Sequence, residues 1–335
     1  MSSNGRDEVG EALEKRRSKT SERIRELKAR LVEAEKLCGD KACVYATGSF
    51  GRREASQHSD LDIFIVSEGT PDEPSLDPLD EILIKADLID ASRAMKIRDF
   101  SGGGEYLKRH TVTELIGAMG TPEDDASNTF TARLLLLLES TPLLGESAYR
   151  RITNKVITAY WRDYEDHKND FMPAFLANDV LRMWRTFCVN YEARTQTEPA
   201  DKKAKRKLKN YKLKHSRLLT CYSGLLYLMA IFVHNKTVSP TDAVAMINLT
   251  PTQRLEWLKN QPHLKEAHAT MGRLIACYEE FLSRTDEPEE QLVNRFMDKD
   301  QYGTFFKTAS ELGDTILEAL DAIGKGNRFR RLVIV

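Results

Sequence analysis

The sequence predicts an α+β fold with a long N-terminal helix, a small sheet core and a larger all-helical C-terminal domain. Three observations indicate this arrangement. Residues 6–37 place apolar side chains at helical spacing within a highly charged stretch. Two short apolar runs within residues 39–110 are typical of buried strands, and from residue 111 onward helical patterns follow one another. We therefore expect three parts, at residues 1–38, 39–110 and 111–335.

Composition places the chain among globular proteins. Its 335 residues are 41% hydrophobic and 30% charged, with a formal net charge of −1, which is enough apolar material for a sizeable core. The longest aliphatic run, Leu134 to Leu138, is far too short to span a bilayer. Five cysteines are scattered without metal-ligand spacing. We expect a cytoplasmic protein with reduced cysteines and no membrane association.

The N-terminal part is expected to form one amphipathic helix over residues 6–37. Its apolar positions are Leu13, Ile24, Leu27, Leu31 and Ala34. A stripe of this kind usually packs on its own domain, and packing on a partner is the alternative.

A small turn ends the first predicted strand. The run from Ala42 to Thr47 is apolar and partly β-branched or aromatic, and it stops at Gly48-Ser49. Glycine permits close approach of the backbone, and a serine at the start of a helical turn offers its hydroxyl and exposed N–H groups to a phosphate. The sequence thus predicts a phosphate-binding turn at Gly48 and Ser49.

Two carboxylates open the second predicted strand, Leu61 to Val66. Side chains alternate across a strand, so Asp60 and Asp62 point the same way while Leu61 points into the core. Adjacent carboxylates repel, and a hard divalent cation such as Mg²⁺, shared with substrate phosphates, stabilises them. The pattern favours a two-metal site for nucleotidyl transfer.

At these residues the chain resembles the DNA polymerase β-like nucleotidyltransferase superfamily. Gly48-Ser49-Phe50-Gly51-Arg52-Arg53-Glu54, followed by Ser59-Asp60-Leu61-Asp62, is most similar to the branch containing the PII-protein uridylyltransferases. The resemblance implies a mixed-sheet core in which Gly48 and Ser49 bind the triphosphate and Asp60 and Asp62 hold the metals. It also implies that Arg52 and Glu54 brace the turn, with Arg52 counted among the nucleotide-binding residues. A surface ion pair is the alternative for Arg52.

The superfamily usually supplies a third carboxylate from a third strand. The run Ala94 to Phe100 is the candidate strand, which makes Asp99 the first choice for a third metal-binding and catalytic acid. Glu105 is the second choice, and Asp87 or Asp90 fits if the strand lies earlier. The alternative for Asp99 is that it merely begins a turn before the glycines at 102–104.

The C-terminal part is expected to be helical throughout. Thr111, followed three residues later by the acidic Glu114, is typical of the N-terminus of a helix. The helices expected beyond it cover Asp124 to Glu139, Ser147 to Asp166, Phe171 to Arg194, Leu208 to His234, Pro240 to Ile247, Pro251 to Asn260, Leu264 to Arg284 and Ser310 to Ile323.

Basic residues are concentrated between Asp201 and Arg217, a segment that contains nine lysines and arginines and one acidic residue. We expect the part before Leu208 to be a solvated loop or helix end. For the second part, Lys212, Lys214 and Arg217 are the candidates for binding the triphosphate, and Tyr211 for stacking on a base. Guidance of an anionic acceptor such as RNA and a solvated helix face are the alternatives.

A second group of residues that could line the nucleotide site, here the second candidate wall, lies on the helix expected over Phe171 to Arg194. Asn178, Asp179, Arg182 and Arg185 recur there at helical spacing. An internal salt-bridge network is the alternative.

These observations predict a Mg²⁺-dependent (or Mn²⁺-dependent) nucleotidyltransferase. It would move a nucleoside monophosphate from an NTP, expected to be ATP, to a hydroxyl of a protein, an RNA or a small molecule, releasing pyrophosphate. Stable DNA binding is not expected. Two alternatives stay open: a cyclic-oligonucleotide synthase of a bacterial antiviral system, and a catalytically inactive nucleotide-binding regulatory module.

Overall fold

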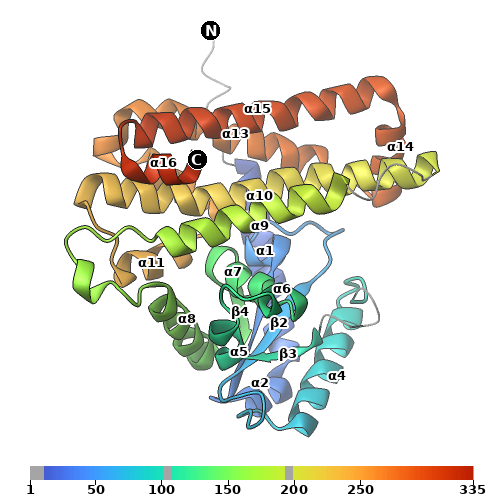
Figure 1. Ribbon diagram of the computed structural model, residues 1–335. Coiled ribbons are helices and arrows are strands. Elements are labelled where there is room, and N and C mark those ends of the chain that lie inside the picture. The colour runs from blue at the N-terminus through green and yellow to red at the C-terminus, as the bar shows by residue number, and fades with distance from the viewer. Residues whose placement is uncertain (1–10, 101–103, 105–106, 193–198, 335) are drawn as a thin grey trace. The chain divides into compact units, whose positions relative to one another are not determined.

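The computed structural model describes residues 11–100, 104, 107–192 and 199–334 (Figure 1). Contacts divide the chain into two units: residues 14–162, here the sheet unit, and residues 1–13 with 163–335, here the helical unit. The predicted α+β class is confirmed. The division differs from the boundary expected at residue 110, because the chain up to residue 162 clusters with the sheet.

The sheet unit contains a four-stranded mixed sheet of order β3-β2-β1-β4. Strand β1 (Ala42–Thr47) pairs antiparallel with β2 (Asp62–Ser67) and with β4 (Thr141–Leu144). Strand β3 (Arg109–Thr111) pairs parallel with β2. The first two strands are where the sequence predicts them, whereas β4 falls in a stretch expected to be entirely helical.

Helices cover both faces of this sheet, and Figure 1 shows α4 and α8 on opposite sides of it. Helices α1 (Glu11–Arg30), α2 (Val32–Cys38) and α4 (Pro78–Ala94) contribute to a hydrophobic core with one face of β1 and β2. On the other face, Tyr45 stacks on Phe64 and donates a hydrogen bond to the carbonyl of Ala132. The remaining elements of the unit are α3 (Gly48–Gly51), α5 (Val112–Gly117), α6 (Glu123–Ala126), α7 (Thr129–Leu138) and α8 (Glu146–Tyr160).

The predicted N-terminal stripe is buried as expected. Ile24, Leu27, Leu31 and Ala34 all belong to the core of the sheet unit, so this part of the stripe packs on its own domain. Leu13, the first residue of the predicted stripe, is also buried but belongs to the helical unit. The helix is not continuous, because Leu31 has φ −105° and ψ 28° and separates α1 from α2.

The third strand does not lie at Ala94 to Phe100, and this prediction is wrong. Helix α4 continues through Ala94, and residues 97–100 form no strand. The strand that joins the sheet is β3, only three residues long. A three-residue strand is too short to produce a recognisable alternating pattern.

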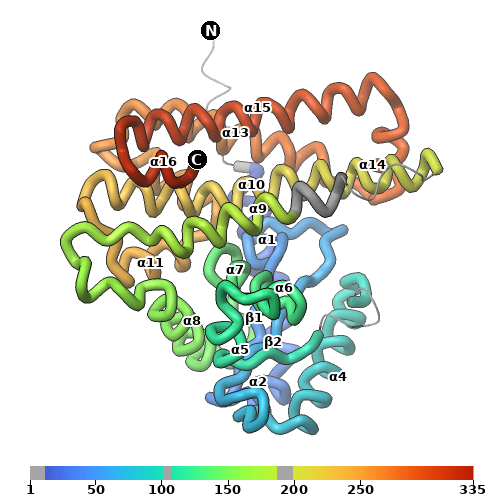
Figure 2. Tube along the Cα trace, viewed as in Figure 1, coloured from blue at the N-terminus to red at the C-terminus, as the bar shows by residue number. Residues whose placement is uncertain are grey.

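The helical unit is built from long helices, and Figure 2 shows α9, α10 and α15 running side by side. Its elements are η2 (Glu165–His167), α9 (Ala174–Glu192), α10 (Ala200–Asn235), α11 (Pro240–Ile247), α12 (Pro251–Lys259), η3 (Pro262–Ala267), α13 (His268–Arg284), α14 (Glu289–Met297), α15 (Lys299–Gly324) and α16 (Arg328–Ile334). Helices α14 and α16 were not predicted.

Helix α10 begins well before the residue the sequence indicates. The basic stretch before Leu208 is helical from Ala200 onward rather than a loop, with Ala204, Leu208 and Tyr211 buried along one side. By length and composition α10 is the one described helix that is long and apolar enough to cross a membrane. Most of its apolar part is buried inside the structure, as in the core helix of a globular domain.

Candidate active site

The turn after β1 forms the four-residue helix α3, and two glycines determine its shape. Gly48 has φ +63°, a conformation that side chains rarely adopt. A Cβ atom at Gly48 would lie 2.6 Å from Oδ2 of Asp62, and one at Gly51 would lie 2.0 Å from the carbonyl oxygen of Glu139. The backbone of α3 therefore approaches both neighbours more closely than another residue allows. Ser49, between these glycines, is half-buried.

The two predicted metal carboxylates lie together at the start of β2. Asp60 and Asp62 are exposed while Leu61 is buried in the core, as the predicted alternation requires, although β2 itself begins only at Asp62. Asp62 is paired with Thr47, the residue before Gly48, in the register of β1 and β2. The carboxylate of Asp62 and the glycine turn thus share one edge of the sheet.

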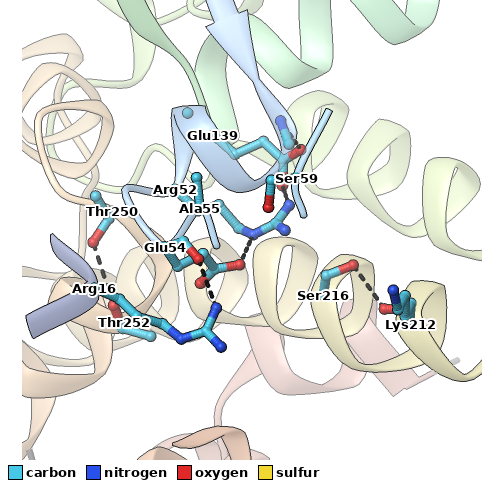
Figure 3. Close-up of polar contacts among 12 residues, drawn as sticks. Arg16, Arg52, Glu54, Ala55, Ser59, Glu139, Lys212, Ser216, Thr250 and Thr252 are labelled. Carbon is cyan, nitrogen blue, oxygen red and sulfur yellow. Dashed lines mark hydrogen bonds and ion pairs between the residues drawn. The ribbon is translucent and has the colours of Figure 1, made fainter. Parts of the chain in front are cut away.

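A buried ionic cluster, Arg52–Glu54–Glu139, lies beside this turn (Figure 3). Arg52 Nε donates to Oε1 of Glu54, and Arg52 Nη1 donates to Oε2 of Glu139 at 2.8 Å. The backbone N–H of Gly48 donates to Oε1 of Glu139 at 3.1 Å. Arg52 is 7% exposed, and both glutamates are 2% exposed.

This cluster decides between the predicted roles of Arg52. The expected bracing of the turn by Arg52 and Glu54 agrees with these contacts, and the alternative of a surface ion pair is wrong. The assignment of Arg52 to nucleotide binding gains no support, because its guanidinium is buried between two carboxylates.

Helix α1 holds the loop that follows the turn. Arg16, Thr20 and Arg23 lie on one side of α1 and donate to the carbonyl oxygens of three consecutive residues, Glu54, Ala55 and Ser56 respectively. Figure 3 shows Arg16 reaching Glu54. Arg23 also stacks over the ring of Phe50 in α3, 4.7 Å from its centroid, and burial lowers the pKa of its guanidinium. Arg16, Thr20 and Arg23 therefore hold the loop after the turn, and Arg23 also packs on the turn itself.

The described residues supply no third carboxylate beside Asp60 and Asp62. Asp99 is exposed in an irregular segment and accepts hydrogen bonds from Arg93, at 3.0 Å from its Nε. Strand β3 carries Arg109, His110 and Thr111 instead of an acid. In the described part of the chain, no group of three or more His, Cys, Asp or Glu side chains is arranged to hold a metal ion. Glu105, the second choice, lies outside the described residues.

His110 contributes a neutral group to the sheet. Its ring lies 6.3 Å from that of Phe64, and burial lowers the pKa of the imidazole. We assign it a packing role.

The predicted cationic residues lie on α10 in the helical unit. Lys212, Lys214 and Arg217 are half-buried there, and Ser216 donates to the carbonyl of Lys212 (Figure 3). Their role in triphosphate binding stays a prediction. Tyr211 is 5% exposed and surrounded by aromatic side chains, and this burial contradicts its predicted stacking on a base. Its ring contacts are His215, Phe281, Phe296 and Phe305.

The second candidate wall has the character of a local network. On α9, Asp179 is buried and pairs with Arg182 at 3.7 Å, and Asn178 donates to the carbonyl of Ala174. Arg185 is exposed. These contacts favour the salt-bridge alternative.

Comparison with known families agrees with this geometry. Residues 24–116 match the nucleotidyltransferase domain family. The matched stretch begins in α1, contains the turn and both aspartates, and is consistent with the DNA polymerase β-like superfamily. Residues 24–116 are thus similar to a nucleotidyltransferase domain, and this similarity supports the general transfer of a nucleoside monophosphate. The narrower resemblance to the PII-uridylyltransferase branch stays a prediction. No curated protein and no solved structure matches the chain.

Sequence reasoning missed Glu139 and the three residues of α1. Glu139 lies 91 residues after Gly48 and outside the matched stretch. The only local signal was its position as an acid just after the buried leucine run of α7. In α1, Arg16, Thr20 and Arg23 share a helix face, but the same spacing is common on solvated helices.

Proposed function

We propose that the sheet unit catalyses the Mg²⁺-dependent or Mn²⁺-dependent transfer of a nucleoside monophosphate from an NTP to an acceptor hydroxyl, with release of pyrophosphate. One observation carries this proposal: Asp60 and Asp62 are exposed on either side of the buried Leu61, and Asp62 lies against Gly48 of the turn. An exposed carboxylate pair beside a glycine-serine turn is the combination that metal-assisted nucleotidyl transfer needs.

The residues present fit divalent metal ions. Asp60 and Asp62 offer hard oxygen donors, which Mg²⁺ and Mn²⁺ prefer, and the absence of a side chain at Gly48 leaves room for the carboxylate of Asp62. When bound, such ions would neutralise charge on the triphosphate and favour deprotonation of the attacking hydroxyl.

The turn supplies the phosphate contacts in this proposal. Ser49 presents its hydroxyl and its N–H at the start of α3, where a phosphate is favoured. Arg52 and Glu54 do not touch substrate but keep the backbone of the turn in place. Binding and orientation of the triphosphate would then depend on a backbone fixed before the nucleotide arrives.

Glu105 is the residue we propose as the third carboxylate. Strand β3 runs parallel to β2, and its first residue, Arg109, pairs with Ile65, three residues after Asp62. Glu105 precedes β3 by four residues in the sequence, whereas Asp99 is ten residues away and paired with Arg93.

The acceptor is proposed to be a protein side chain, as in the branch that the motif resembles, and the nucleotide to be ATP. A cyclic-oligonucleotide product is one outcome that the assay below distinguishes. A catalytically inactive nucleotide-binding module is the second candidate function, because the described residues of β3 carry no acid.

The test uses each α-³²P-labelled NTP with Mg²⁺ or Mn²⁺ and a lysate as a source of acceptors. Label on protein, on RNA and in small cyclic products is separated, and pyrophosphate release is measured. We expect label on protein with ATP, and loss of all products in the Asp60→Asn/Asp62→Asn double variant. If the protein binds nucleotide but releases no pyrophosphate from any NTP, the enzyme proposal is wrong and the catalytically inactive regulatory module takes its place.

A paired comparison tests the third carboxylate. Glu105→Gln is expected to abolish turnover, and Asp99→Asn to leave it unchanged. The reverse result would return the role to Asp99.

A further inference from the structure

Glu139 occupies an electrostatically unfavourable place in the sheet unit. It caps the C-terminal end of α7, where the helix dipole already carries partial negative charge. It is also buried, and it shares the single guanidinium of Arg52 with a second buried carboxylate, Glu54. A buried carboxylate in such a position costs stability unless its contacts offset the loss of hydration.

The contacts that offset the cost of burying Glu139 are made with residues of the turn and with Arg52, which follows it. One carboxylate oxygen accepts from Arg52 and the other accepts from the backbone N–H of Gly48. The carbonyl of Glu139 also lies where the Cβ of any larger residue at position 51 would be. The first and last residues of α3 are therefore both fixed by Glu139.

We infer that Glu139 is a positioning residue for nucleotide binding: by engaging the Gly48 N–H, it sets the backbone of the turn so that Ser49 is the first residue free to meet the triphosphate. This inference rests on the proposed function. It adds a residue from outside the matched nucleotidyltransferase stretch, in the link between α7 and β4.

A matched control exists in the same unit. Asp124 is also a buried carboxylate paired with a buried arginine, since Arg133 donates to it at 2.8 and 2.6 Å. Its contacts with Thr129 and Arg133 hold α6 to α7. Loss of Asp124 should reproduce the general cost of breaking a buried ion pair without moving Gly48.

The experiment measures the Kd of ATP with Mg²⁺ by calorimetry for the full chain and for Glu139→Ala, Glu139→Gln and Asp124→Asn. We expect Glu139→Ala to weaken binding about tenfold, the equivalent of one lost charge-assisted hydrogen bond. Glu139→Gln keeps an oxygen that can accept from Gly48 and should lie between wild type and Glu139→Ala. Asp124→Asn removes the ion pair with Arg133 and no contact of Glu139 with the turn, so it should bind within about twofold of wild type.

A second measurement separates this inference from the proposed function. Hydrogen exchange of the Gly48 amide, followed by NMR, should accelerate in Glu139→Ala, and to a smaller extent in Glu139→Gln, while the amides of β1 keep their protection. If wild type binds ATP but transfers no nucleotide, the enzyme proposal fails and the Kd series still decides the role of Glu139. An unchanged Kd in both Glu139 variants, or an equal loss in Asp124→Asn, would overturn the positioning role.

Discussion

Two pairs of carboxylates surround the turn Gly48 to Gly51, and the environment of each pair differs sharply. Asp60 and Asp62 are exposed at the edge of the sheet, whereas Glu54 and Glu139 are buried around Arg52. Exposed carboxylates remain accessible to ions and phosphates, while buried ones are occupied in holding the backbone. The exposed acids thus supply the charge for chemistry, and the buried acids fix the shape of the turn. Loss of the exposed pair should therefore reduce activity more than stability, and loss of the buried pair should reduce stability more than activity.

The largest effect is expected from the exposed pair. Asp62→Asn keeps the size of the side chain but removes its charge, and turnover should fall about 10³-fold because transition-state charge loses its stabilisation. The free energy of unfolding should stay unchanged, since Asp62 is exposed. Pyrophosphate release and urea denaturation measure the two quantities. Equal losses of activity and stability would show that Asp62 belongs with the structural acids.

The buried pair should show the reverse. Arg52→Met leaves Glu54 and Glu139 buried without their shared cation, and breaking a buried pair in this way costs about 3–5 kcal/mol of unfolding free energy. Arg133→Met, which leaves Asp124 buried, should cost a similar amount. Urea denaturation of both variants provides the measurement. A cost below about 1 kcal/mol for Arg52→Met alone would contradict the buried cluster.

The contrast between the two pairs also explains how much the sequence revealed. Asp60, Asp62, Gly48 and Ser49 lie within fifteen consecutive residues, and strand alternation with turn chemistry is enough to bring them together. Glu139 reaches the same turn from 91 residues away. No local periodicity encodes that approach, because it depends on β4 pairing with β1.

The misplaced third strand has a similar cause. The run Ala94 to Phe100 has the composition of a strand, but its first residue ends α4 and Ile97 packs into the core of the sheet unit. Tertiary packing has overridden local propensity there. The strand that forms, Arg109–Thr111, is fixed by its pairing with β2 rather than by its own sequence.

The helical unit contains an ionisable group that is neither exposed nor ion-paired: His215 is buried as a neutral ring. It stacks on Phe281 with centroids 4.5 Å apart, its Nδ1 lies 2.9 Å from the carbonyl of Tyr211, and burial lowers the pKa of the imidazole to about 4. Between that value and the ordinary 6.5, the unfolded chain binds a proton that the folded chain does not. His215 therefore makes the protein less stable as the pH falls from 6.5 to 4.

The expected loss from His215 across this range is about 3 kcal/mol. It is measured as the difference in unfolding free energy between wild type and His215→Leu at several pH values. The carboxylates titrate in both proteins, so their contribution cancels in this difference. The difference should grow in favour of the variant as the pH falls. A constant difference would show that His215 can be protonated within the folded helical unit.

The smallest effect is expected from Asp99, an exposed carboxylate that belongs to neither pair around the turn. Hydrogen bonds from Arg93 lower the pKa of its carboxyl, so its contribution to stability is present at neutral pH and is lost as the pH falls through that lowered value. Exposure screens this interaction, and Asp99→Asn should leave both the urea midpoint and turnover at wild-type values. A loss of turnover comparable to that of Asp62→Asn, with stability retained, would instead place Asp99 among the acids that act on substrate. It would require the segment after α4 to leave Arg93 and reach the edge of the sheet, which hydrogen exchange across residues 95–100 would detect.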